Sequence, residues 1–141
     1  MTEISVRIRV WHDAEAEAMR VREAVFVVEQ GVPLQIERDE WDPRSDHALA
    51  FAAAGQVVGT GRLLPDGHIG RMAVLTGWRK RGVGGEILNA LMERARERGM
   101  RRVVLNAQTH AAPFYARHGF RAFGAEFMEA GIPHIAMARE L

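Results

Sequence analysis

Apolar and polar positions alternate from Ser5 to Trp11, as they do in a half-buried strand. Asp13 then offers an N-cap for a helix from about Ala14 to Glu29. The apolar side of that helix is expected to hold Met19, Val21, Ala24, Val25 and Val28. Between Gln30 and Asp46 the periodicity stops, and Gly31, two prolines and an acidic run predict a long loop or a broken helix. Loops of this length in compact domains are often functional.

The rest of the chain alternates between strand-like and helix-like patterns. Strands are predicted over 48–53, 56–64 and 68–74, over 103–105, and twice within 120–141 around the turn at 129–131. Helices are predicted over 82–98, where the apolar positions have helical spacing, and over 111–118. The resulting order, β-α-β-β-β-α-β-α-β-β, predicts one α+β domain over residues 1–141. Its sheet is expected to be mixed, mostly antiparallel and flanked by helices.

Composition narrows the class of protein. The apolar share of 48% and the charged share of 26% suit a chain that buries a core. No apolar run approaches the roughly 20 residues that cross a bilayer, and the first residues lack the pattern of a signal peptide, so we expect a cytoplasmic protein without membrane contact. A formal charge of +1 argues against a dedicated nucleic-acid binder. Without cysteine, and without metal-ligand spacing among its 6 histidines, the chain is expected to bind no metal.

A basic, glycine-rich turn separates the strand that ends at Val74 from the helix predicted over 82–98. The turn contains Arg79, Lys80, Arg81, Gly82, Val83, Gly84 and Gly85. Glycines let backbone N–H groups approach an anion, and the start of a helix adds unpaired N–H groups and a positive dipole end. The turn therefore predicts a pyrophosphate cradle, although an ordinary turn with exposed basic residues would have the same composition. A P-loop would need lysine and serine or threonine here, and a dinucleotide fingerprint would need glycine where Ile87 stands.

Two motifs resemble those of a known family. Arg79-x-x-Gly82-x-Gly84, directly after a strand, resembles the acetyl-CoA pyrophosphate loop of the GNAT superfamily. The segment from Ala111 to Phe120 is similar to that family's Ala-x-x-Phe/Leu-Tyr-x-x-x-Gly-Phe pattern. Gln108 stands where the family often has asparagine, so the amide is kept on a longer arm. The two motifs occur in the family's order, each on the expected element.

The resemblance implies a fold, a donor and a set of binding residues. In such a fold the strand over 70–74 splays from the strand over 103–107, and the pantetheine arm of acetyl-CoA inserts between them like an added strand. Its amides would pair with the backbone of Met72, Ala73 and Val74, while Gln108 and Phe114 would complete the donor site. The activity implied is transfer of an acetyl group from acetyl-CoA to a primary amine of a small molecule or a protein.

The resemblance assigns Tyr115 as the general acid that protonates the departing thiolate. A packing aromatic would be the structural alternative for this residue, which is the only tyrosine of the chain. The chain has no cysteine and only two serines, so direct attack in a ternary complex is favoured over a covalent acyl-enzyme.

The base that accepts the proton of the amine is expected at the family's acceptor site. Candidates there are Glu29, Glu37, Asp39, Glu40, Glu129 and His134, each of which could also be a solvated or capping residue. His134 is favoured because imidazole titrates near neutrality, and Glu29 because partial burial at the end of an apolar helix would raise its pKa. The number of acidic candidates suggests a cationic acceptor, such as a polyamine, an aminoglycoside, a lysine or an N-terminal amine.

Two other functions fit the same residues. One is a non-catalytic module that binds or senses acyl-CoA, and the other is a nucleotide-binding module that uses the same glycine turn. An exposed sheet edge in so small a domain would also allow a homodimer.

Overall fold

The computed structural model describes residues 4–34 and 38–141 of the chain. Its strands are β1 (Ile4–Val10), β2 (Asp46–Ala52), β3 (Val57–Leu63), β4 (His68–Val74), β5 (Arg102–Gln108), β6 (Arg121–Glu129) and β7 (Ile132–Glu140). Its helices include α1 (Trp11–Arg22), the π-helical segment η1 (Glu23–Glu29), α3 (Val83–Glu97) and α4 (Ala112–Arg117). Short 3₁₀ turns span Asp42–Arg44, Thr76–Trp78 and Thr109–Ala111. The predicted order of helices and strands is confirmed.

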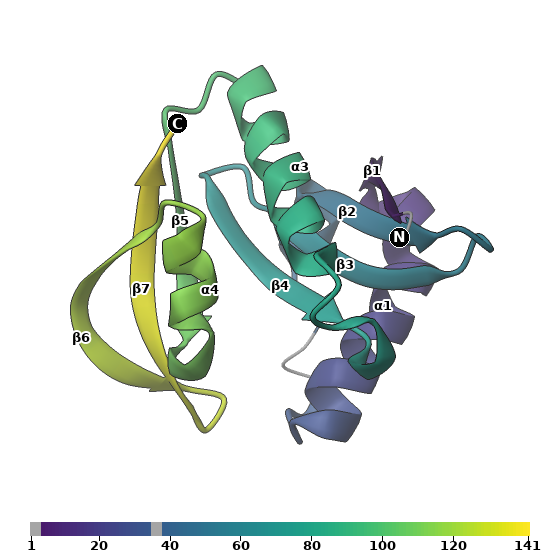
Figure 1. Ribbon diagram of the computed structural model, residues 1–141, viewed down its shortest axis with the longest axis horizontal. Helices are drawn as coiled ribbons and strands as arrows, with labels where there is room; N and C mark the ends of the chain where they lie inside the picture. The colour runs from purple at the N-terminus through teal and green to yellow at the C-terminus, as the bar shows by residue number, and fades with distance from the viewer. Residues whose placement is uncertain (1–3, 35–37) are drawn as a thin grey trace.

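The described strands form one seven-stranded sheet in the spatial order β1-β2-β3-β4-β5-β7-β6. Neighbouring strands run antiparallel except β4 and β5, which are parallel. The predicted mixed, mostly antiparallel α+β sheet is therefore confirmed. Figure 1 shows α3 and α4 on the side of the sheet that faces the viewer, whereas α1 lies behind β2, β3 and β4.

Helix α3 buries the stripe of apolar side chains that its sequence spacing predicts. The buried residues are Val83, Ile87, Leu88, Leu91, Met92 and Ala95. They join the larger core cluster with the inward-facing side chains of the sheet, which include Val103 and Leu105 of β5. Burial of a large aliphatic side chain stabilises a fold by about 1.5–3 kcal/mol. This packing fixes the first turn of α3 against the end of β4, where the functional site lies.

The first helix differs from its prediction at both ends. It begins at Trp11, directly after Val10, so Asp13 lies inside the first turn and is not the N-cap. At the other end, Glu23–Glu29 winds as a π-helix, whose wider turn rotates the apolar face relative to an α-helix. Val25 is buried as expected, but Ala24 and Val28 are exposed. A 3.6-residue period cannot predict that rotation.

A buried ion network fastens the segment before β2 to the helix and the sheet. Arg22 donates two hydrogen bonds to the Asp42 carboxylate at 2.9 and 3.1 Å, and Arg62 donates another at 2.9 Å. Arg62 also donates to both oxygens of Asp39, at 2.7 and 2.8 Å, and Arg71 donates to Asp39 at 3.1 Å. The side chains of Arg22 and Asp42 are each 1% exposed. The charges therefore compensate one another away from water.

The two carboxyl groups of this network stay ionised. Burial alone would raise the pKa of Asp42, but the hydrogen bonds and charge of Arg22 outweigh it and hold that pKa below its ordinary value. At Asp39, burial alone would also raise the pKa of the carboxyl group, but the hydrogen bonds and charge of Arg62 and the charge of Arg71 outweigh burial and lower that pKa. Both carboxylates consequently stabilise the folded chain at neutral pH.

The sheet opens between β4 and β5. Their parallel ladder consists of His68 opposite Val104 and Ile69 opposite Leu105. Next along β4, Arg71 adopts a φ of 49°, and the register with β3 shifts there. Such a bulge bends a strand away from its partner. Beyond it, β4 runs on beside β3 alone, so the predicted splay of the two parallel strands is present.

Candidate functional site

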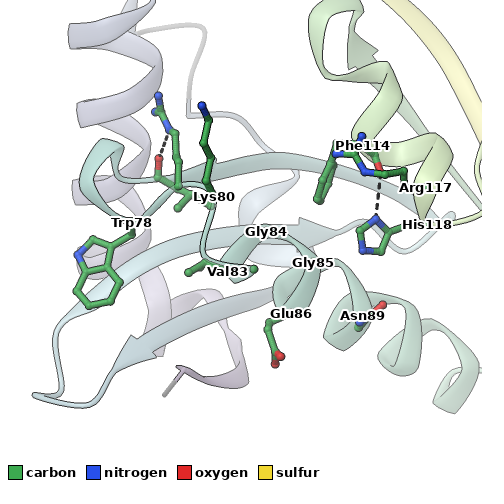
Figure 2. Close-up of a pocket in the computed structure, with 13 residues that line it drawn as sticks. Trp78, Lys80, Val83, Gly84, Gly85, Glu86, Asn89, Phe114, Arg117 and His118 are labelled. Carbon is green, nitrogen blue, oxygen red and sulfur yellow. Dashed lines mark hydrogen bonds between the residues drawn. The ribbon is translucent and has the colours of Figure 1, made fainter. Parts of the chain in front are cut away.

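A groove of about 570 Å³ lies at the wide end of this opening, between the first turn of α3 and helix α4. Figure 2 shows the side chains that surround it. The lining residues are Val74, Trp78, Arg79, Lys80, Gly82, Val83, Gly84, Gly85, Glu86, Asn89, Phe114, Arg117 and His118. The groove thus joins the predicted glycine turn to the predicted aromatic segment, which are about thirty residues apart in the sequence.

Gly82 ends the turn and begins the helix. It has a φ of 82°, in the left-handed region that an L residue with a Cβ atom adopts only at a cost of about 1–2 kcal/mol. The first bond within α3 runs from the Glu86 amide to the Gly82 carbonyl at 3.1 Å. The amides of Val83, Gly84 and Gly85 therefore have no partner within the helix and can bind an anion.

The next two glycines allow α4 to approach the same turn. A Cβ atom placed on Gly84 would lie 3.3 Å from the Phe114 ring, and one on Gly85 would lie 3.1 Å from His118 Nε2. The sequence interpretation, in which these glycines clear space for an anion, is thus incomplete. They also bring α3 and α4 together, and this contact forms the wall of the groove.

The basic residues of the turn have different environments. Arg79 donates to both oxygens of Glu29, at 2.7 and 2.6 Å, and its Nε donates to the Val74 carbonyl at 2.9 Å. Arg81 stacks over the Trp78 ring at 5.1 Å and does not line the groove. Lys80 lines it and forms no ion pair with a residue that the structure describes. Of the three predicted cations, Lys80 is the one available to a ligand in the groove.

The open edge of β4 presents the backbone of alternate residues. The Leu75 amide bonds to the Val58 carbonyl in β3 at 2.9 Å. Because successive backbone groups of a strand point to opposite sides, those of Ala73 face β3, and those of Met72 and Val74 face the opening. The expectation that all three residues present free backbone is therefore wrong for Ala73. The Val74 carbonyl is already used by Arg79, which leaves the Val74 amide and the Met72 backbone at the edge.

Tyr115 is half-buried behind the groove. Its ring meets those of Phe114 and Phe120 edge-on, with centroid distances of 5.0 and 6.0 Å. Burial raises the pKa of Tyr115 to about 12, so the hydroxyl is protonated at neutral pH. That hydroxyl has no hydrogen-bond partner among the described residues. A protonated phenol of this kind can act as an acid toward a group that enters the opening.

His134 lies on β7, opposite Gln108 at the end of β5. Its Nδ1 is 2.7 Å from the Ile132 carbonyl, which can only accept, so Nδ1 carries a hydrogen. In the neutral ring Nε2 then keeps its lone pair, and this nitrogen lies 3.5 Å from a Glu129 carboxylate oxygen. His134 is 6% exposed, and its ring stacks on that of Phe127. The Ile132 carbonyl thus fixes the ring so that Nε2 faces the Glu129 carboxylate.

Gln108 does not line the groove. Its side-chain amide exchanges hydrogen bonds with that of Gln30, at 2.9 and 3.4 Å. Gln30 directly follows η1, so this amide pair links the end of the first helix to the far side of the opening. The neighbouring Glu29 bonds to Arg79 on the near side. Residues 29 and 30 therefore span the opening from one strand to the other.

Two of the acidic candidates are engaged with arginines. Hydrogen bonds from Arg79 hold the pKa of Glu29 below its ordinary value, and the side chain is exposed. The predicted burial and raised pKa of Glu29 are therefore wrong. Asp39 is bound to Arg62 and Arg71, and its pKa is also lowered. Carboxylates of this kind are poor bases near neutrality, and the acidic surplus that suggested a cationic acceptor is partly cancelled.

Of the remaining candidates, Glu40 and Glu129 are exposed, and Glu37 lies outside the described residues. Glu129 accepts a hydrogen bond from Asn106 at 3.4 Å and faces His134. The geometry therefore brings His134 and Glu129 together, whereas Glu29 is paired with Arg79.

Sequence reasoning missed part of the groove, namely Trp78, Glu86, Asn89, Arg117 and His118. A helical period could have indicated Glu86 and Asn89, which lie one turn apart on α3. Arg117 and His118 follow the aromatic motif directly, but their approach to α3 depends on Gly84 and Gly85. That tertiary contact has no signature in the sequence.

Within residues 4–34 and 38–141, no group of three or more histidine and acidic side chains is arranged to hold a metal ion. No helix in that part of the chain is long and apolar enough to cross a membrane.

A sheet that opens between two parallel strands, with a glycine turn and unpaired helix amides at its mouth, has the fold of solved N-acetyltransferase structures. The chain belongs to the GNAT family, since the family model described as "Acetyltransferase (GNAT) domain" matches residues 12–141. It is 43% identical to the uncharacterized N-acetyltransferase YjcF of Bacillus subtilis over 128 residues, which are 88% of this chain and 91% of that one.

Solved structures agree with this family. The crystal structure of Escherichia coli ElaA is similar with a TM-score of 0.85 and 30% identity, covering 98% of this chain and all (100%) of that one. An acyl-CoA N-acyltransferase from Pseudomonas aeruginosa is similar with the same TM-score, 0.85, and 30% identity, covering 97% and 99% of the two chains.

Proposed function

We propose that this protein transfers an acetyl group from acetyl-CoA directly to a primary amine, within a ternary complex. The observation that carries the proposal is the open edge of β4 beyond Ile69, which ends beside the glycine turn at Gly82. At the same end of the sheet, the parallel strand β5 ends at Gln108, opposite His134. Relatives named as N-acetyltransferase and acyl-CoA N-acyltransferase support the donor class and attack by nitrogen. A cytoplasmic location would suit this donor.

In this proposal the two ends of the site bind different parts of the donor. The amides of Val83, Gly84 and Gly85, with Lys80, hold the diphosphate. The backbone of Met72 and the amide of Val74 pair with the pantetheine arm, as a strand pairs with a sheet edge. A backbone amide of Met72 or Val74 can donate to the thioester oxygen while negative charge develops on it.

The chemical step then needs two proton transfers. The amine nitrogen forms a bond to the thioester carbon, and His134 Nε2 accepts the proton that the nitrogen loses. As the carbon–sulfur bond breaks, Tyr115 gives its hydroxyl proton to the sulfur, so that an acetamide and free CoA leave. Much of the rate would come from holding donor and acceptor together, which converts a bimolecular step into an intramolecular one.

The proposal is tested by incubating the purified protein with acetyl-CoA and a panel of primary amines. The panel holds polyamines, aminoglycosides, free amino acids and short peptides with an N-terminal or lysine amine. Release of free thiol, together with an acetylated amine identified by mass spectrometry, is the expected result. Calorimetric binding of acetyl-CoA without transfer to any amine would favour a non-catalytic acyl-CoA module. Binding of ATP or NAD in place of CoA would overturn the proposal.

With an acceptor identified, His134→Gln is expected to lower kcat/KM by about 10²-fold or more, because an amide cannot accept the proton. The dissociation constant of acetyl-CoA should stay within about twofold of wild type. His110→Gln is the matched control, since His110 is exposed. A kcat/KM in the His134 variant equal to that of wild type would remove this residue from catalysis.

A further inference from the structure

The candidate base lies on the face of β5, β7 and β6 that is turned away from α4 (Figure 1). Residues directly opposite each other in an antiparallel pair have their side chains on the same face. Gln108 is opposite His134, and His134 is opposite Phe127, so these three side chains share one face. Ala107 and Ile135 alternate with them and belong to the core cluster that includes the buried side of α3. His134 is therefore on the outer face of these strands.

The side chains beside His134 on this outer face are mostly apolar. Phe127 is exposed, and its ring stacks on the His134 ring with centroids 5.9 Å apart. Ile132 and Ala136, which flank His134 on the same face of β7, are half-buried. Glu129, opposite Ile132, adds a carboxylate 3.5 Å from His134 Nε2. An acceptor that brings its nitrogen to His134 would thus meet one negative charge within an apolar surface.

The distribution of charge argues against a polycationic acceptor. Polyamines and aminoglycosides have several ammonium groups, each of which needs a compensating charge when it leaves water. Glu29 is bound to Arg79, and Asp39 is bound to Arg62, so their negative charges are already compensated. Glu129 pairs with no arginine or lysine within the part of the chain that the structure describes. The site therefore suits an acceptor with a single ammonium group and an apolar remainder.

We infer that the acceptor is a small monoamine whose nitrogen is attached to an aliphatic or arylalkyl group, and that Phe127 determines this specificity. The inference rests on the proposed function and names the class of acceptor within it. The transfer is unchanged: the nitrogen–carbon bond forms, the carbon–sulfur bond breaks, His134 accepts the amine proton and Tyr115 protonates the sulfur. As the nitrogen approaches His134 Nε2, the apolar group of the amine would lie against the Phe127 ring and leave water.

The experiment measures kcat/KM of wild type with acetyl-CoA and a series of n-alkylamines from propylamine to hexylamine at one pH. These amines have nearly the same basicity, so the length of the apolar chain is what changes. We expect kcat/KM to rise about fourfold for each methylene that leaves water, or about sixtyfold over the series. Ethanolamine and spermidine provide a polar and a polycationic comparison, and hexylamine should exceed both. This series requires no variant to fold.

Two variants test the role of Phe127. Phe127→Ala is expected to reduce the rise to below about twofold for each methylene, because the apolar contact is lost. Phe123→Ala is the matched control, which should keep the wild-type rise. Phe123 is exposed on the same face of the same strand, but it lies opposite Ala136 and contacts Arg102, whose Cζ is 5.7 Å from the ring centroid.

The outcomes separate the claims. A kcat/KM that does not rise with chain length, or a preference for spermidine, would overturn the inference and leave the proposed function standing. An equal rise in wild type and Phe127→Ala would overturn the role of Phe127. A wild-type dimer that Phe127→Ala dissociates in analytical ultracentrifugation would show that a second copy covers this face, and would also overturn the inference. Absence of thiol release with every amine of the series and of the wider panel would overturn the proposed function itself.

Discussion

Asp42→Asn is expected to lower the free energy of unfolding by about 3–5 kcal/mol, the usual cost of breaking a buried ion pair from one side. The carboxylate is 1% exposed and accepts hydrogen bonds from Arg22 and Arg62. Asparagine keeps the shape but removes the negative charge, so two guanidinium groups lose compensation away from water. Urea denaturation monitored by circular dichroism measures the change. Because a small domain has only about 5–15 kcal/mol of stability, this would be a large share of the total.

Glu93→Gln is the matched control, since it breaks the ion pair between Arg96 and Glu93, whose side chains are 42% and 65% exposed, respectively. Exposed pairs contribute up to about 1 kcal/mol, so the control should denature close to wild type. A difference below 1 kcal/mol between Asp42→Asn and this control would contradict a stabilising role for the network.

The pH dependence of stability has a definite sign. The pKa of Asp42 is lowered in the folded chain, so its contribution is present above the ordinary carboxyl pKa of about 3.9 and is lost as the pH falls through the lowered value. Asp39 acts in the same direction. Wild type should therefore lose stability below about pH 4 more steeply than Asp42→Asn, which has one such group fewer.

Tyr115→Phe is expected to reduce kcat by about 10²–10⁴-fold, the range that general acid–base catalysis contributes. Burial raises the pKa of the hydroxyl to about 12, so wild type has the proton to give at every pH of interest. Phenylalanine keeps the edge-on contacts with Phe114 and Phe120, so the fold and the groove should be preserved. Steady-state kinetics with the identified acceptor, together with calorimetric binding of acetyl-CoA, measure the two effects separately.

The expected signature is a fall in kcat with the dissociation constant of acetyl-CoA within about threefold of wild type. Turnover at the wild-type rate would show that the sulfur obtains its proton elsewhere. A loss of acetyl-CoA binding would instead assign Tyr115 to packing of the donor site. Phe120→Leu offers a comparison, because it perturbs the same aromatic cluster and leaves the hydroxyl in place.

Local patterns were sufficient to predict most of the architecture. The helical spacing of Val83, Ile87 and Leu91 predicted α3, and these three side chains are buried. The alternation from Ser5 onward predicted β1. Both features depend on residues close in sequence, so periodicity was enough. The opening of the sheet was implied only by the resemblance of the glycine turn and the aromatic segment to the GNAT motifs.

The errors concern contacts between distant segments. Nothing near Glu29 in the sequence indicates that Arg79, fifty residues later, will bind it and lower its pKa. Asp39 likewise finds Arg62 in a strand whose position depends on the whole sheet. The π-helical segment after Arg22 rotates side chains by an amount that a regular period does not contain. Electrostatic environment follows tertiary structure, so the roles of ionisable residues were the least predictable part of the site.

The brief ladder between β4 and β5 has a consequence beyond chemistry. Two residue pairs are all that directly join the backbone of the larger and smaller parts of the sheet among the described residues. A coenzyme bound between these strands would connect the two parts of the sheet and so stabilise the fold. Any ligand that binds only the native chain stabilises it, by about 2.7 kcal/mol at one hundred times its dissociation constant. The lifetime of this protein in a cell would then lengthen when its own donor is plentiful and shorten when the cell is starved of it.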